Sequence, residues 1–298
     1  MEFIDAHRER FGVEPICRVL SEHACPIAPS TFHAAKKRLP SPRAVRDVTM
    51  TAIMLTIFTK NYSVYGAHKL WKAMRRAGHE IGRDQVARLM RQAGIRGIRR
   101  GKQVITTRPD PAGSRATDLV KRQFTADAPN RLWVLDLTYV STWEGMAYVC
   151  FIVDAFSRMI VGWRVAGNMR TDMVLDAMEM AAWKRATHLG GLIVHSDAGS
   201  QFTSIRFTER VDEIGARPSI GTVADSYDNA LAETVNGLYK TELTKRRGPW
   251  KQIETLELAT AEWVLWFNTE RLHGTLGDIP PVEFEAEWHA AQLLAVAG

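Results

Sequence analysis

The sequence is poor in cysteine and contains no long apolar run. Its three cysteines, Cys17, Cys25 and Cys150, are odd in number and form no Cys-x-x-Cys pair, which argues against a disulfide framework and against a zinc finger. No run reaches the roughly 18 apolar residues of a membrane span. The N-terminus lacks the basic start and apolar core of a secretory signal. A protein of the reducing cytoplasm fits these absences.

Positive charge is plentiful but unevenly distributed. The formal net charge is +6, yet residues 1–128 carry 24 Lys and Arg against 11 Asp and Glu, whereas residues 129–298 carry 15 against 22. A chain of 298 residues is long enough for two or more domains. Ordinary solubilising charge could explain the asymmetry, but an excess of this size favours a nucleic-acid-binding region joined to a region of different purpose.

Residues 1–95 are expected to be helical. Residues 1–42 hold two short helical patterns that could form a helix-turn-helix, although any small helical hairpin would look similar. Residues 43–95 hold three more, and the last two end at Gly78 and Gly94, residues typical of helix C-termini. This pair is typical of a helix-turn-helix module whose last helix enters a major groove. Its predicted core is Leu70, Met74, Val86, Leu89 and Met90, and its predicted DNA-facing residues are Lys69, Lys72, Arg75, Arg76, Arg88 and Arg91.

Residues 96–128 are expected to form a basic linker. Glycines and prolines interrupt any periodicity there. Its cations, Arg99 and Arg100 among them, could follow phosphates without reading base sequence. A plain solvated linker is compatible with that role.

From Pro129 the pattern changes to alternating strands and helices. Three adjoining strands predict an antiparallel meander, and the full order is β-β-β-α-β-α-β-α. An α/β fold with a mixed sheet flanked by helices buries this pattern economically. The predicted strands cover residues 133–140, 147–154, 160–165, 192–197 and 218–220, and the predicted helices cover 171–187, 204–214 and 225–240.

Three carboxylates stand at notable places in this pattern. Asp136 lies inside an apolar strand, Asp197 ends the fourth strand, and Glu233 lies on the last helix. A lone buried carboxylate costs several kcal/mol unless it is paired or bound to a metal. If strands one and four are neighbours, the three carboxylates converge and suit Mg²⁺ or Mn²⁺. Taken singly, each could instead be an ordinary turn or edge residue.

Other residues of this region leave alternatives open. Asp154 and Glu179 are rival carboxylates, and Asp154 is expected to pair with Arg158 at a turn. On the last helix, Asn229, Glu233, Asn236 and Lys240 share one face, which could be a solvated surface or part of a site. His195 could border the site or be a strand histidine satisfied by the backbone.

Three motifs in order resemble the Asp-Asp-Glu signature of retroviral-integrase-like transposases. Thirty-five residues separate Asp197 from Glu233, which is the spacing of that signature, and Lys240 follows seven residues after Glu233. The likeness covers almost the whole chain and is greatest to OrfB-type transposases of bacterial insertion sequences. The motifs are Trp133-x-x-Asp136-x-Thr138-Tyr139, His195-Ser196-Asp197-x-Gly199-Ser200-Gln201-Phe202 and Asp228-Asn229-Ala230-x-Ala232-Glu233, with a matching tail from Trp266 to Gly277.

The resemblance implies a ribonuclease-H-like catalytic core over residues 129–246 and a helical extension over 247–298. It implies that Asp136, Asp197 and Glu233 hold two Mg²⁺ or Mn²⁺ ions. The implied reaction hydrolyses a phosphodiester at an element end, after which the freed 3′-OH attacks a new strand. Lys240 would contact DNA. Arg271 and His273 could also contact DNA, or could instead have a capping or ion-pair role.

The resemblance also implies partners. Double-stranded DNA, as terminal inverted repeats and as target, would be bound by a homo-oligomer in the cytoplasm, associated with the nucleoid. An upstream OrfA-type subunit or frameshift fusion is a further expectation, because the chain shows no heptad run for self-assembly. The rival interpretations are a ribonuclease-H-type nuclease and a DNA-binding regulator with an inactive catalytic fold.

Overall fold

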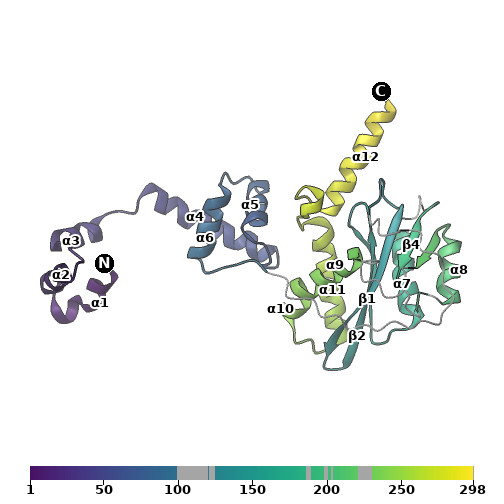
Figure 1. Ribbon diagram of the computed structural model, residues 1–298, viewed down its shortest axis with the longest axis horizontal. Coiled ribbons are helices and arrows are strands. Elements are labelled where there is room, and N and C mark those ends of the chain that lie inside the picture. The colour runs from purple at the N-terminus through teal and green to yellow at the C-terminus, as the bar shows by residue number, and fades with distance from the viewer. Residues whose placement is uncertain are drawn as a thin grey trace. The chain divides into compact units, whose positions relative to one another are not determined.

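The computed structural model describes residues 1–98, 120, 125–185, 189–197, 201–202, 204–220 and 230–297. Its contacts divide the chain into two units, Met1–Ile53 and Met54–Gly298, each with its own interior (Figure 1). No helix within the described residues is both long and apolar enough to cross a membrane.

The first unit is a small helical cluster around Ile4, Ile16, Cys17 and Phe32, all buried. The sequence predicted two of its short helices and missed the first. That helix buries only Ile4, while Phe3 is 58% exposed, so it carries no apolar stripe for periodicity to detect. The unit contains α1 (Glu2–Phe11), α2 (Val13–Glu22), α3 (Pro29–Lys37) and the first part of α4 (Pro42–Lys60).

The second unit begins with the predicted helical pair, α5 (Ala67–Arg76) and α6 (Arg83–Gln92). All five residues predicted to form its core are buried. Gly78 and Gly94 follow the two helices with φ of +83° and +66°. The backbone amides of His79 and Ile95 then donate to Met74 and Met90, as expected where a glycine in the left-handed region ends a helix.

A five-stranded mixed sheet forms the centre of the second unit, in the order β3-β2-β1-β4-β5. The antiparallel meander β3-β2-β1 was predicted. Strand β4 extends it as the parallel neighbour of β1, and β5 is the parallel neighbour of β4. This is the ribonuclease-H-like arrangement expected from the sequence. The strands are β1 (Leu132–Thr142), β2 (Gly145–Asp154), β3 (Ile160–Ala166), β4 (Ile193–Ser196) and β5 (Arg217–Ile220).

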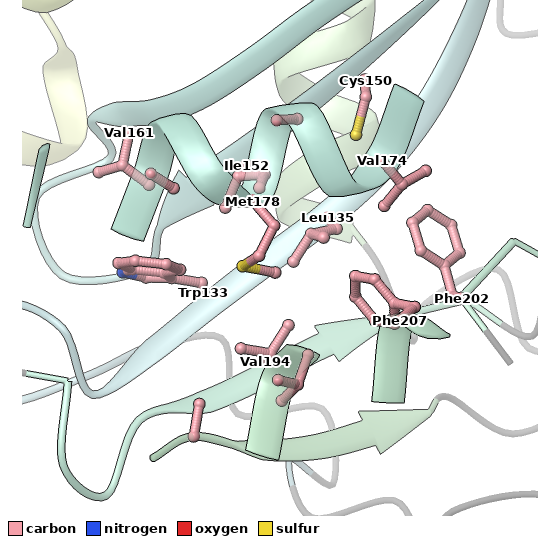
Figure 2. Close-up of a cluster of buried hydrophobic side chains, with 14 of the residues drawn as sticks. Trp133, Leu135, Cys150, Ile152, Val161, Val174, Met178, Val194, Phe202 and Phe207 are labelled. Atoms are coloured by element: carbon pink, nitrogen blue, oxygen red, sulfur yellow. The ribbon is translucent and has the colours of Figure 1, made fainter. Parts of the chain in front are cut away.

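One face of the sheet is covered by α7 (Thr171–Lys184) and α8 (Ile205–Glu213). Figure 2 shows its interior, where Trp133 and Leu135 of β1 meet Val174 and Met178 of α7. Close approach depends on Gly162, because a Cβ there would lie 2.2 Å from the Ala177 carbonyl oxygen. This face is therefore closely packed and apolar.

The other face is covered by α9 (Ala230–Tyr239) and α11 (Ile253–Thr269). Phe151 of β2 packs edge-on against Tyr239, with ring centroids 5.0 Å apart, and Trp263 of α11 completes the aromatic cluster. The hydroxyls of Tyr239 and Thr260 share a hydrogen bond of 2.7 Å. A π-helical turn, η1 (Lys240–Thr244), and α10 (Lys245–Arg247) connect α9 to α11.

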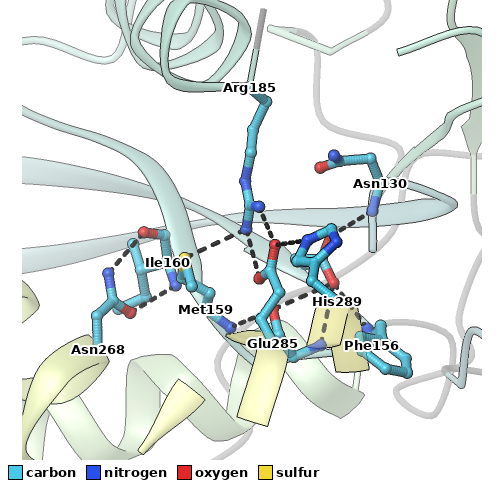
Figure 3. A network of polar contacts seen from close by, with 10 residues as sticks. Asn130, Phe156, Met159, Ile160, Arg185, Asn268, Glu285 and His289 are labelled. Atoms are coloured by element: carbon cyan, nitrogen blue, oxygen red, sulfur yellow. Dashed lines mark hydrogen bonds and ion pairs between the residues drawn. The ribbon is translucent and has the colours of Figure 1, made fainter. Parts of the chain in front are cut away.

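The chain ends with a short 3₁₀ turn, η2 (Gly274–Leu276), and α12 (Pro281–Ala297). Figure 3 shows how α12 is held: the Arg185 guanidinium donates to both carboxylate oxygens of Glu285. The predicted Asp154–Arg158 ion pair is not a direct contact within the described residues, although the charge of Asp154 partly offsets the lowering of the Arg158 pKa by burial. Asp154 is fully buried and accepts backbone N–H groups instead, including those of Asn130 at 2.8 Å and Phe156 at 2.9 Å.

Candidate active site

Asp136 lies in β1, and Asp197 directly follows β4, the parallel neighbour of β1. Val134 of β1 pairs with His195 of β4, and each stands two residues before one of the aspartates. Side chains two residues apart share a face of a sheet, and neighbouring strands lie about 4.8 Å apart. The register therefore brings the two aspartates side by side, as the sequence predicted if these strands were neighbours.

Asp136 is fixed at both carboxylate oxygens. The Leu137 backbone amide donates to Oδ1 at 2.8 Å, and Asn236 Nδ2 donates to Oδ2 at 3.0 Å. Burial of the carboxyl, then the negative charges of Asp197 and Glu233, raise the pKa of Asp136 to about 8. All three predicted carboxylates are therefore close enough to interact electrostatically.

The side of α9 that carries Glu233 and Asn236 is directed toward Asp136. Asn236 reaches Asp136 and is itself buried, and Glu233 lies three residues earlier on the same side of the helix. The sequence left Asn236 open between a surface amide and a site residue, and the structure places it in the site. Its helical spacing from Glu233 was the available signal. Asn229 lies outside the described residues.

The donors gathered here are oxygen atoms, which are the ligands that Mg²⁺ and Mn²⁺ prefer. Asn236 Oδ1 is buried beside Asp136 and has no hydrogen-bond partner among the described residues. The described residues contain no group of three or more His, Cys, Asp or Glu side chains arranged to hold a metal ion. Crowded carboxylates with a raised Asp136 pKa nonetheless fit a cation, because a positive charge would relieve their repulsion.

Lys240 stands at the end of the same stripe, in the π-helical turn. Its Nζ lies 4.6 Å from the centroid of the Tyr139 ring of β1. Both residues are partly open to solvent, so the lysine remains accessible.

The remaining candidates of the core have structural partners. His195 is buried, and its Nδ1 lies 2.9 Å from the Ser219 hydroxyl of β5. Glu179 lies on α7 and binds Arg210 of α8, with 2.9 Å between Oε2 and Nη2. It is therefore on the face of the sheet opposite Asp136 and takes no part in the site.

Arg271 and His273 lie in the interior, only 5% and 6% exposed. Arg271 donates to both oxygens of Glu242, with 2.6 Å from Nη2 to Oε1 and 3.0 Å from Nε to Oε2. His273 Nε2 lies 3.3 Å from the Phe267 carbonyl oxygen. The ion-pair role that the sequence left as the alternative is the one that Arg271 occupies here.

Two of the predicted DNA-facing cations of α5 are paired with the C-terminal part of the chain. Lys72 Nζ lies 3.8 Å from Asp278, and Arg76 Nη2 lies 2.5 Å from Glu283. Lys69 lies over the Tyr65 ring at 5.8 Å.

The other predicted cations lie on exposed or half-exposed surface. Arg75 and Arg91 are exposed, and Arg91 Nε makes a long contact of 3.4 Å to the Ala87 carbonyl oxygen. Arg88 donates to Gln92 at 3.2 Å. Arg99 and Arg100 lie outside the described residues. DNA contact stays a prediction for all of these positions.

Comparison with known families agrees with this architecture. Residues 126–226 and 214–281 match two families described as integrase core domains, and residues 46–103 match an HTH-like domain. Among solved structures, the chain is similar to the HTLV-2 integrase catalytic core domain, with 18% identity, a TM-score of 0.43, and coverage of 53% of this chain and 98% of that one.

Relatives of nearly full length were also found. The chain is 54% identical over 277 residues to a putative transposase for the insertion sequence element IS986/IS6110 of Mycobacterium tuberculosis, covering 92% of this chain and all of the relative. It is 44% identical over 296 residues to the transposase for IS629 of Shigella sonnei, covering 98% and 97%. The chain therefore belongs to the insertion-sequence transposases that carry an integrase core domain.

Proposed function

We propose that this transposase performs metal-dependent DNA cleavage and strand transfer at the ends of its insertion sequence, with Asp136, Asp197 and Glu233 as the catalytic carboxylates. The observation that carries the proposal is the in-register pairing of β1 with β4, which brings the aspartates together beneath the Glu233 stripe of α9. Asp136 and Asp197 would lie on the same face of the central sheet, the face that α9 covers.

The three carboxylates would hold Mg²⁺ or Mn²⁺, which in such sites activates a water or 3′-OH and stabilises the leaving oxygen. The chain's own contribution is positioning. Leu137 and Asn236 fix the two oxygens of Asp136, and preset geometry lowers the barrier of a phosphoryl transfer that needs little other chemistry from the protein. Lys240 would bind a phosphate near the reacting bond.

The remaining residues would deliver the DNA. We assign residues 1–42 and 43–95 to end recognition, 96–128 to a phosphate-tracking linker, 129–246 to catalysis and 247–298 to a supporting extension. The exposed Arg75 and Arg91 would contact phosphates directly. A homo-oligomer on DNA, joined by an OrfA-type partner, would bring two ends and a target together.

The test uses the full chain with duplex DNA bearing the inverted repeats that flank its gene. We expect nicking and strand transfer that require Mg²⁺ or Mn²⁺. Asp136→Asn, Asp197→Asn and Glu233→Gln should each abolish both steps while DNA binding is retained. Metal-independent cleavage, or full activity in all three variants, would contradict the proposal.

A ribonuclease-H-type nuclease is the alternative enzyme. The HTH-like match at residues 46–103 speaks for duplex DNA instead. Offering an RNA–DNA hybrid of the same sequence separates the two, because a transposase should leave the hybrid intact while it cuts the inverted repeat. A dependence on an OrfA-type partner would show as activity that appears only when that protein is added.

A further inference from the structure

The C-terminal end of β1 and the turn that follows it carry two exposed aromatic rings, each with a lysine over it. Tyr139 is 48% exposed and Trp143 is 69% exposed. Lys240 Nζ lies 4.6 Å from the centroid of the Tyr139 ring, and Lys251 Nζ lies 5.3 Å from that of Trp143. We call these four residues the hairpin-tip surface, because Trp143 lies in the β1–β2 turn.

The Trp143 ring is exposed on a well-anchored turn. The backbone amide of Trp143 donates to the Trp250 carbonyl at 3.0 Å, and Thr142 forms a parallel bridge to the same residue. Glu144 accepts the Ile253 backbone amide at 3.1 Å, and Thr142 Oγ1 donates to the Gly145 carbonyl at 2.9 Å. The turn is therefore tied to the start of α11, and the ring is presented from a fixed position.

The segment that leads to Lys251 exposes only basic charge. Between residues 240 and 251 the exposed charged residues are all basic, namely Lys245, Arg246, Arg247 and Lys251. The acidic residue of that segment, Glu242, is buried against Arg271. Glu144, on the turn itself, uses its carboxylate on the Ile253 amide. Arg247 is ion-paired with Glu262 at 3.1 Å, so Lys245, Arg246 and Lys251 are the cations that this segment offers to a polyanion.

We propose that the hairpin-tip surface binds the DNA strand leading away from the reactive phosphate, with Trp143 stacking on a base that is unpaired or at a strand end and Lys251 binding a phosphate beside it. The inference rests on the proposed function. Aromatic rings combined with cations are how proteins hold single-stranded nucleic acid, because every base offers a face for stacking.

The spacing fits a strand that starts at the carboxylates. Trp143 lies in the turn directly after β1, seven residues beyond Asp136, or roughly 23 Å if about 3.3 Å per residue is counted along the strand. Consecutive nucleotides of one strand are about 3.4 Å apart along a duplex, so the ring would meet the strand about seven nucleotides from the reacting bond. Tyr139, with Lys240 over its ring, lies between the two residues in the sequence.

The first experiment measures binding by fluorescence anisotropy to two labelled DNAs of the same inverted-repeat sequence. One is fully paired, and the other carries three mismatched positions centred seven nucleotides from the cut. Trp143→Ala should weaken binding to the mismatched DNA by about 5- to 100-fold, the range expected for loss of one stacked base, whereas Trp143→Phe should retain it. Trp183→Ala is the matched control, because Trp183 is 86% exposed on α7, across the sheet.

The second experiment distinguishes the two possible sources of the strand. If it belongs to the element end, Trp143→Ala should reduce cleavage of that end; if it belongs to the target, only strand transfer into a plasmid should fall. The inference is overturned if Trp143→Ala and Trp183→Ala bind both DNAs equally well and carry out both reactions equally well. If the wild-type chain binds the DNAs but cuts neither, the proposed function fails, while the binding comparison still decides the role of Trp143.

Discussion

The two faces of the central sheet are built from the same strands yet differ in kind. Facing α7 and α8, Trp133 and Leu135 belong to an apolar cluster. Facing α9 and α11, the alternate positions include Asp136, His195 and Ser219, with Asn236 opposite them. The period of two along a strand lets one face supply stability while the other carries charged and polar groups that packing alone would not select.

The largest expected effect comes from neighbouring residues of β1. Asp136→Asn should lower DNA cleavage by about 10³-fold or more, given the several kcal/mol that a metal-held transition state gains, and leave the fold intact. Leu135→Ala, one residue earlier on the other face, should instead cost about 2–5 kcal/mol of unfolding free energy. Cleavage assays and chemical denaturation of both variants measure the contrast. A loss of stability in Asp136→Asn as large as that in Leu135→Ala would contradict the expected difference between the two faces of the sheet.

The next effect concerns the buried ion pair below α9. Arg271→Met leaves the Glu242 carboxylate buried without its cation, which should cost about 3–5 kcal/mol. Adding Glu242→Leu removes the stranded charge and should recover most of that loss. Urea denaturation of the two single variants and the double variant measures the coupling. Simple additivity of the two single losses would show that the pair is not the source of the effect.

Glycines offer a matched test of packing on the two faces. Gly162→Ala should destabilise the protein by about 1–3 kcal/mol, as overpacking does, because its Cβ would press on Ala177. On α9, a Cβ at Gly237 meets nothing within 4 Å, so Gly237→Ala should stabilise by roughly 0.5–1 kcal/mol through helix propensity. Thermal unfolding of the two variants measures both changes in stability. If both variants were destabilised, or both stabilised, the expected difference in packing between the two faces would be contradicted.

The smallest effect is a pH dependence at His273. Burial, followed by the charge of Arg271, holds the pKa of this imidazole well below its usual value. The unfolded chain takes up a proton near pH 6.5 and the folded chain does not, so stability falls as pH drops below that value. Between pH 7 and 6 the loss is about 0.7 kcal/mol.

His273→Gln should remove that part of the pH dependence, and denaturation at the two pH values in parallel tests it. His33→Gln, at an exposed histidine of the first unit, is the control. An unchanged slope in His273→Gln would assign the pH dependence to other groups.

Periodicity and spacing were sufficient to predict the strands and the meander, because these depend on local pattern and short connections. The neighbouring positions of Asp136 and Asp197 were predicted only on the condition that the first and fourth strands are neighbours, which the pairing of β1 with β4 meets. The partners of Arg271 and Asp154 were not predictable. Arg271 binds Glu242, which lies 29 residues away in the sequence, and the residues around each of the two do not indicate that they pair. Asp154 accepts hydrogen bonds from backbone amides of its own turn and of Asn130. Backbone amides are common to nearly all residue types, so the sequence does not reveal these partners.

The β1–β4 ladder also determines which changes in chain length the site tolerates. Asp136 and Asp197 are 61 positions apart in the sequence, yet their separation is set by the pairing of Leu132, Trp133 and Val134 with β4. Insertions in the connection between β3 and α7 would therefore leave the two aspartates side by side. One residue added between Val134 and Asp136 would turn Asp136 toward α7. Relatives of this transposase should vary in length freely in that connection and hardly at all in the two residues before each aspartate.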